Sequence, residues 1–249
     1  MSGHSKWSSI KHQKGAADAA RGKVFAKMAR QIEVAARAGG GDVDMNPSLR
    51  LMVAKARGVS MPKDNIDRAI KRGTGEIEGV SYTEINYEGY ATHGVAVYVE
   101  TLTDNKNRTG PEIRTIFSKA GGSLAEPGAV AWQFARKGII EIPAASTTED
   151  ELMDVALEAG AEDINNMGET FQVVTEGSDL FAVKTKLEEK GLEVTSSDLA
   201  MLPTTLIKID NADHAQSILK VIDALEEHDD VQNVYANMDI SDEVIASLS

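Results

Sequence analysis

The chain has 249 residues, of which 42% are hydrophobic and 26% are charged, a composition typical of a globular protein with one large domain or two to three small ones. It contains no cysteine, which excludes a disulfide scaffold, a thiolate metal site and a cysteine nucleophile. No apolar run approaches the roughly 18 residues that a transmembrane helix needs, and the first residues lack the apolar segment of a secretory signal. We therefore expect a soluble, cytoplasmic protein with no membrane partner.

The net charge of −13 conceals two parts of opposite sign. Residues 1–75 hold 15 Lys and Arg against 6 Asp and Glu, whereas the remaining 174 residues hold 11 basic and 33 acidic ones. Such asymmetry indicates a basic part that binds a polyanion, while the acidic remainder would repel phosphates. The alternative interpretation is that the basic residues form an ordinary hydrated surface.

The first part of the chain predicts a basic arm followed by three helices. Residues 1–15 show no hydrophobic periodicity, so we expect a flexible arm there. Over residues 16–38, apolar residues recur at three- and four-residue steps, and the basic residues fall on the opposite face. Residues 47–57 and 62–72 predict two further helices, with Asn46 as the N-cap of the first and Gly73 just past the end of the second.

After residue 75 the period changes from helix to strand. Residues 84–90 and 94–102 predict strands, residues 109–120 predict a helix that opens with a Thr109–Glu112 capping box, and residues 129–135 are strand-like. Residues 138–203 follow the order βαββαβ, which forms a complete ferredoxin-like unit. A short strand at 205–209, a helix at 212–227 and a strand at 231–238 remain, and we pair them with the strands before residue 138.

The predicted fold is therefore multidomain, α plus α+β. We expect an N-terminal basic arm and three-helix domain over residues 1–78. Two α/β domains follow: the second domain comprises residues 79–137 and 204–249, and a ferredoxin-like third domain, residues 138–203, is inserted in it.

The chain resembles the YebC family, which includes the mitochondrial translational activator of cytochrome oxidase. The resemblance rests on motifs that run in order along the whole chain, among them GHSKW from Gly3, GGGD from Gly39, NPSLR from Asn46, MPKDNIDRAIKRG from Met61, LTDNKNRT from Leu102 and ISDEV from Ile240. Departures are local: Gln13 stands where a basic residue is usual, Ala20 where a Lys is common, and Ala91-Thr92-His93 replaces a Gly/Pro-rich turn.

The resemblance implies three domains, the third inserted in the second, and a non-enzymatic, cytoplasmic regulator of gene expression that binds nucleic acid. Members are usually labelled probable DNA-binding transcriptional regulators. Other members act on the ribosome, where they would bind rRNA and help elongation through difficult sequences such as proline runs. Transcription is our first interpretation, and translation is the alternative.

The candidate nucleic-acid-binding residues lie in the arm, in the first helix and in one loop. Basic side chains can neutralise phosphates, and Trp7 offers a plane on which a base can stack. The loop at 103–108 precedes a predicted helix N-terminus and would hold a phosphate, although Asp104 opposes an anion and the loop could be a simple turn. The candidates are Lys6, Trp7, Lys11, His12, Lys14, Arg21, Lys23, Lys27, Arg30, Lys106 and Arg108.

No cofactor, metal or small-molecule substrate is expected. The five histidines lack metal-ligand spacing, the Gly73-Thr74-Gly75 segment is not a P-loop, and no nucleophile is paired with a base. Two other classes remain open: an adaptor that works through its acidic domains, and an enzyme whose site would be a polar pocket on the inserted domain.

Overall fold

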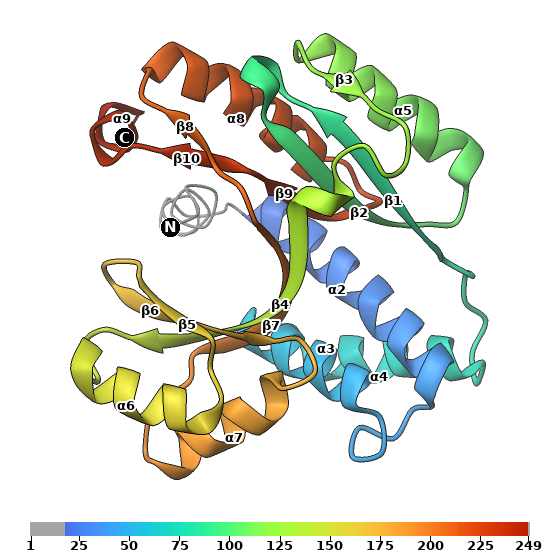
Figure 1. Cartoon of the computed structure of the whole chain (residues 1–249). Coiled ribbons are helices and arrows are strands. Elements are labelled where there is room, and N and C mark those ends of the chain that lie inside the picture. The colour runs from blue at the N-terminus through green and yellow to red at the C-terminus, as the bar shows by residue number, and fades with distance from the viewer. Residues whose placement is uncertain (1–17, 249) are drawn as a thin grey trace. The chain divides into compact units, whose positions relative to one another are not determined.

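The computed structural model describes residues 18–248, and it mixes helices with sheets (Figure 1). The chain divides into two compact units. We call residues 135–202 the continuous unit, and we call the described residues on either side of it, 18–134 and 203–248, the discontinuous unit. None of the helices in these described residues has the length and apolar character needed to cross a membrane.

The discontinuous unit begins with three helices that share a hydrophobic core. The core is built on Ile32 of the first helix, Leu49 and Val53 of the second, and Ile66 of the third, all buried. The Asn46 side chain accepts a hydrogen bond from the N–H of Leu49, so it caps the second helix as the sequence predicts. The helices are α2 (Asp18–Gly39), α3 (Pro47–Gly58) and α4 (Lys63–Thr74).

A four-stranded antiparallel sheet follows in the same unit, in the order β3-β1-β2-β9. Strand β9 pairs with β2, so segments on both sides of residues 135–202 share one sheet. Phe117 of α5 and Ile218 and Ile222 of α8 are buried in one cluster with Val97 and Val99 of β2, which places both helices against the sheet. The elements are β1 (Thr83–Tyr90), β2 (Ala96–Thr103), α5 (Lys106–Lys119), β3 (Ser123–Leu124), α8 (Ala212–Glu226) and β9 (Val231–Ala236).

Asn237 divides the last part of the chain into two strands. Its backbone N–H donates to the Ala96 carbonyl, and its side-chain oxygen accepts from the Ala96 N–H at 2.8 Å. The chain therefore leaves the first sheet at this buried asparagine. It continues as β10 (Met238–Ile240), which pairs in parallel with β8 (Ile207–Ile209) and is followed by α9 (Asp242–Leu248).

The continuous unit follows the order βαββαβ and forms one sheet in the order β5-β6-β4-β7. Leu152 of α6 and Leu187 of α7 are buried with Ile140 and Val173 of the sheet, so both helices share this core. Thr148 and Glu151 form a capping box at the start of α6. The elements are β4 (Phe134–Pro143), α6 (Glu149–Ala159), β5 (Asp163–Asn166), β6 (Thr170–Glu176), α7 (Leu180–Glu189) and β7 (Ser196–Pro203).

Four local predictions are corrected. The predicted strand at 129–135 holds only for Phe134 and Ala135, which begin β4, and the residues before them form a loop with a short 3₁₀ helix, Ala131–Gln133. The predicted strand at 231–238 is broken at Asn237. Helix α4 continues past Gly73 to Thr74, and Gly75, at φ 80°, is the residue that ends it. The fourth correction concerns the start of α5 and is described below with the candidate site.

Candidate nucleic-acid interface

Five of the eleven candidate residues lie outside the described residues. They are the arm residues Lys6, Trp7, Lys11, His12 and Lys14. The other six belong to the discontinuous unit, where α2 carries four of them and the start of α5 carries two.

The basic face of α2 contacts the end of helix α8 within the discontinuous unit. Lys23 Nζ donates to the Glu227 carbonyl at 2.6 Å and to its carboxylate at 2.8 Å. Lys27 Nζ donates to the Glu226 carbonyl at 2.7 Å. These are carbonyls at the C-terminal end of α8, where the helix dipole favours cations. Arg21, nearer the start of α2, is exposed.

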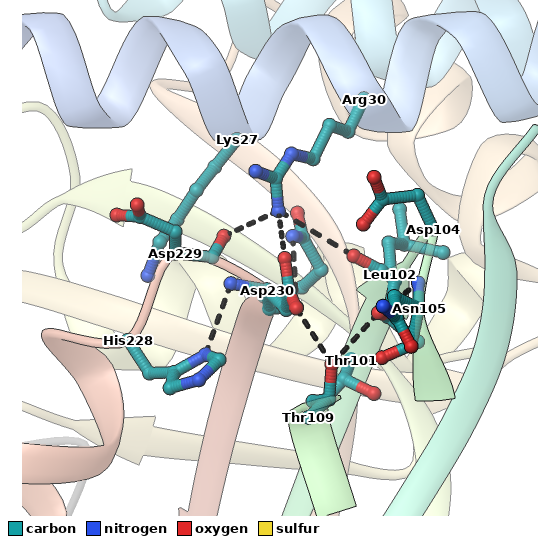
Figure 2. Close-up of polar contacts among 12 residues, drawn as sticks. Lys27, Arg30, Thr101, Leu102, Asp104, Asn105, Thr109, His228, Asp229 and Asp230 are labelled. Carbon is teal, nitrogen blue, oxygen red and sulfur yellow. Dashed lines mark hydrogen bonds and ion pairs between the residues drawn. The ribbon is translucent and has the colours of Figure 1, made fainter. Parts of the chain in front are cut away.

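Arg30, two helical turns after Lys23 on α2, also contacts the segment that follows α8 (Figure 2). Its guanidinium donates to the Asp229 carbonyl at 2.7 Å and to Asp230 Oδ1 at 2.8 Å. The Arg30 guanidinium also lies 5.4 Å from the centre of the Tyr82 ring, a cation–π distance. Three of the predicted phosphate ligands on α2 are therefore bound to the protein itself.

Asp230 is the centre of this polar cluster, and its side chain is only 3% exposed. Besides Arg30, it accepts a hydrogen bond from Arg108 Nη2 at 2.7 Å and from the Thr109 hydroxyl at 2.7 Å. Burial raises the pKa of Asp230, but the hydrogen bonds from Thr109 and Arg108 and the two guanidinium charges outweigh it and lower the pKa to about 2. Asp230 is thus a carboxylate at neutral pH, and it joins α2, α5 and the loop before β9.

Lys27 is the cation of this contact whose charge is disfavoured by burial. Burial is the main cause that lowers its pKa to about 8, and it outweighs the attraction of Glu226. Its ammonium donates to a backbone carbonyl, and the attraction of the carboxylates of Glu226, Glu227 and Asp229 offsets only part of the effect of burial.

The predicted phosphate loop has a different structure, because α5 begins at Lys106 and not at Thr109. Asn105 is the N-cap and accepts a hydrogen bond from the Arg108 N–H. Thr109 lies inside the helix, buried against Asp230. Arg108 is paired with Asp104 at 2.8 Å and with Asp230, whereas Lys106 is exposed on the first turn.

The structure also shows basic residues that sequence reasoning did not select. Arg57, near the end of α3, and Lys63, Arg68 and Lys71 of α4 are exposed, and they form no ion pair within the described part of the chain. The buried residues Ile66, Ala69 and Gly73 define the inner face of α4. A helical projection from that face places Arg68 and Lys71 outward, and this signal could have identified them from the sequence.

Three local features bear on the metal and enzyme interpretations. Among residues 18–248, no group of three or more His, Asp or Glu side chains is arranged to hold a metal ion. His93 and His214 stack with their ring centroids 3.6 Å apart. A mainly apolar cavity of about 190 Å³ lies beside Glu33, Arg37 and Tyr82 in the discontinuous unit.

Comparison with known proteins places this architecture in a family. Residues 5–76 match the TACO1/YebC protein N-terminal domain, and residues 82–238 match the TACO1/YebC second and third domain. A probable transcriptional regulatory protein of Rubrobacter xylanophilus is 56% identical over 250 residues, with full coverage of both chains. Another from Desulforapulum autotrophicum is 53% identical over 244 residues, or 98% of each chain.

A solved structure supports the same assignment. The crystal structure of a conserved hypothetical protein from Aquifex aeolicus superposes with a TM-score of 0.84 at 44% sequence identity, covering 92% of this chain and 94% of that one. Family domains, full-length relatives and fold agree: the chain belongs to the TACO1/YebC family.

Proposed function

We propose that the protein is a non-enzymatic regulator of gene expression that acts in the cytoplasm and binds nucleic acid through its basic N-terminal part. The first interpretation is a DNA-binding transcriptional regulator, in keeping with the names of the relatives. The arm residues, Arg21 and Lys106 are proposed as direct phosphate contacts, with Trp7 as a stacking surface.

The observation that carries the proposal is the set of exposed cations on α3 and α4. Arg57, Lys63, Arg68 and Lys71 project from the helices without an ion pair among the described residues. Exposed Lys and Arg side chains bind phosphates by releasing counterions, without a requirement for base sequence. We add these four residues to the proposed interface.

We further propose the division into three domains at the boundaries expected from the sequence, although β4 and the continuous unit begin at residues 134 and 135, shortly before the expected boundary at residue 138. The strand order β5-β6-β4-β7 and the two helices of the continuous unit support a ferredoxin-like fold for the third domain. The pairing of β9 with β2 supports a second domain assembled from both flanking segments.

Binding to ribosomal RNA, with a role in translation, is the second candidate. Helix α2 is the longest helix described, and its cations at positions 23, 27 and 30 point to the protein itself. A helix that reads the major groove must direct such side chains to base edges, so the observed orientation favours binding to a backbone or to folded RNA.

Binding should be measured for a DNA duplex and for a structured RNA at several salt concentrations. If about six phosphates are neutralised, log affinity for the duplex should fall with log salt at a slope near −5. The variant Arg68→Glu/Lys71→Glu should bind more weakly and reduce the magnitude of that slope by about two. A higher affinity for RNA than for DNA at equal salt would favour the translation role.

The matched control is Lys184→Glu/Lys190→Glu, which makes the same change in net charge on the acidic continuous unit. It should leave affinity nearly unchanged. If both variants weaken binding equally, only net charge matters and the proposed surface is wrong. If the parent protein binds neither polymer at low salt, the adaptor interpretation replaces this proposal.

A further inference from the structure

The contact between α2 and the end of α8 uses cations that a phosphate backbone would need. We call Lys23, Lys27 and Arg30 together with segment 226–230 the clip. We propose that the clip is an autoinhibitory contact: nucleic acid competes with segment 226–230 for these cations, and full binding requires the clip to open. This inference rests on the proposed function.

The competition follows from the donors involved. Lys23 and Lys27 point their ammonium groups at the carbonyls of Glu227 and Glu226, at 2.6 and 2.7 Å. Arg30 directs its Nη1 atom to the Asp229 carbonyl and to Asp230. The Lys23 and Arg30 side chains are only 35% and 20% exposed in this contact. A phosphate oxygen can therefore take the full set of N–H donors of these cations only when the clip opens.

The outer half of the clip, at Lys23 and Lys27, is the half that opens first. The carboxylate partners of Lys23 are Glu227, with a side chain 77% exposed, and Asp229, with one 71% exposed. Exposed pairs of this kind are weak and screened by salt. Arg30 and Asp230, by contrast, form a pair at 2.8 Å with side chains only 20% and 3% exposed, and this end of the clip opens last.

Lys27 favours opening in the presence of a polyanion. Its charge is desolvated in the closed clip, where its ammonium donates to a neutral carbonyl and the nearby carboxylates offset only part of the effect of burial. A phosphate offers a full negative charge in a more hydrated site, so transfer of Lys27 from carbonyl to phosphate relieves the cost of burial.

A reversible crosslink tests the proposal without changing charge. Gln31 of α2 and Gln232 of β9 lie beside the clip, and the Gln31 side-chain amide donates to Gln232 at 3.2 Å. Because the chain has no cysteine, Gln31→Cys/Gln232→Cys would introduce a single defined pair. Oxidised protein holds the clip closed and reduced protein releases it, and thiol titration reports which form is present.

The oxidised form should bind the RNA or duplex more weakly than the reduced form, with a salt slope smaller in magnitude by about two. A second variant, Glu227→Gln/Asp229→Asn, weakens the clip from the anionic side and keeps every cation. It should bind roughly threefold more tightly than the parent protein.

The outcomes separate the two proposals. Equal affinity of the oxidised and reduced forms, with ordinary salt-dependent binding by the parent, would show that the clip is only structural and would overturn the inference while leaving the proposed function intact. Absence of binding by the parent, the reduced form and the weakened-clip variant would overturn the proposed function and the inference together. If the disulfide does not form, the weakened-clip variant decides: affinity no higher than that of the parent overturns the inference.

Discussion

Arg30 and Arg108 bind different oxygens of the same carboxylate, that of Asp230. Arg30 Nη1 lies 2.8 Å from Oδ1, and Arg108 Nη2 lies 2.7 Å from Oδ2. Each arginine comes from a different helix, α2 or α5, so one buried charge joins the N-terminal helices to the sheet with its covering helices. Removing that charge tests how much it contributes to the stability of the discontinuous unit.

Asp230→Asn should lower the free energy of unfolding by about 3–5 kcal/mol, because it leaves two guanidinium groups beside a neutral amide in a buried site. Urea denaturation followed by circular dichroism measures the loss. The control is Asp229→Asn, the same chemical change at a neighbouring side chain that is 71% exposed, which should cost less than about 1 kcal/mol. If both variants lost the same free energy of unfolding, the Asp230 carboxylate would contribute no more to stability than that of Asp229.

The same residue predicts a pH dependence. The pKa of Asp230 is about 2 in the folded protein and 3.8 in the unfolded chain, so the folded state binds a proton less readily. The stability that the carboxylate contributes is present above pH 3.8 and is lost as pH falls towards 2. The difference in stability between the parent and Asp230→Asn should therefore narrow over that window.

Lys27 should make stability rise with pH as Asp230 does, but in a window at high pH. Burial lowers its pKa to about 8, below the value of 10.5 expected when unfolded. Between these two values the unfolded chain binds more protons than the folded one, so the contribution of Lys27 to the free energy of unfolding rises with pH. In Lys27→Met this rise should be absent, and at pH 7 the variant should be as stable as the parent or more stable by roughly 1–2 kcal/mol.

Chemical denaturation from pH 7 to 10.5 checks this prediction. Lys71→Met is the control, because Lys71 is exposed on α4 and is not among the charges that act on Lys27, so this variant should keep the parent's slope. A parallel course for the parent and Lys27→Met would show that Lys27 stays protonated in both states.

Glu88 holds a loop through backbone N–H groups. Its carboxylate accepts hydrogen bonds from Gly128 and Val130, each at 2.6 Å, and from Ala131 at 2.8 Å. Burial raises its pKa, but these three donors outweigh that effect and lower the pKa below its usual range. The loop also carries Trp132, whose side chain is 73% exposed.

Glu88→Gln should lower the free energy of unfolding by about 1–3 kcal/mol. The NH₂ group of glutamine is a donor, so at least one backbone N–H group of the loop would lose its acceptor. Urea denaturation measures this cost, and increased amide hydrogen exchange at residues 128–131 would localise it. Glu126→Gln, at an exposed position of the same loop, is the control. Unchanged exchange in Glu88→Gln would contradict a role for Glu88 in ordering the loop.

Local signals predicted most elements of the fold, because they depend on neighbouring residues. Apolar periodicity located α2 and α3, and the cap residue Asn46 placed the start of α3. The start of α5 was missed because Asn105 and Thr109 are both acceptable caps. Burial of Thr109 against Asp230, which is 121 residues away in the chain, decides between them.

The candidate site was less predictable, because its contacts join residues that are far apart in the chain. The pattern of α2 shows which face is basic, but not what that face contacts. Lys27 and its acceptor Glu226 are 199 residues apart, and a lysine facing solvent has the same local sequence as one facing a helix end. The exposed Arg68 and Lys71 could be found from helix periodicity alone, since their position depends only on which face of α4 is buried.

Gly73 lies where α4 comes close to α2. A Cβ atom at Gly73 would lie 2.5 Å from the Glu33 carbonyl oxygen and 2.7 Å from the Ala36 Cβ atom. Gly73→Ala should therefore lower the free energy of unfolding by about 1–3 kcal/mol, since one of the two helices must move.

Gly22→Ala is the control, because Gly22 lies within α2 and a Cβ atom added there would meet no described atom within 4 Å outside the neighbouring backbone. That substitution should stabilise the protein by up to about 1 kcal/mol through helix propensity. Thermal and urea denaturation of the two variants should thus shift in opposite directions, and a stabilising effect of Gly73→Ala would show that α2 and α4 are not in close contact.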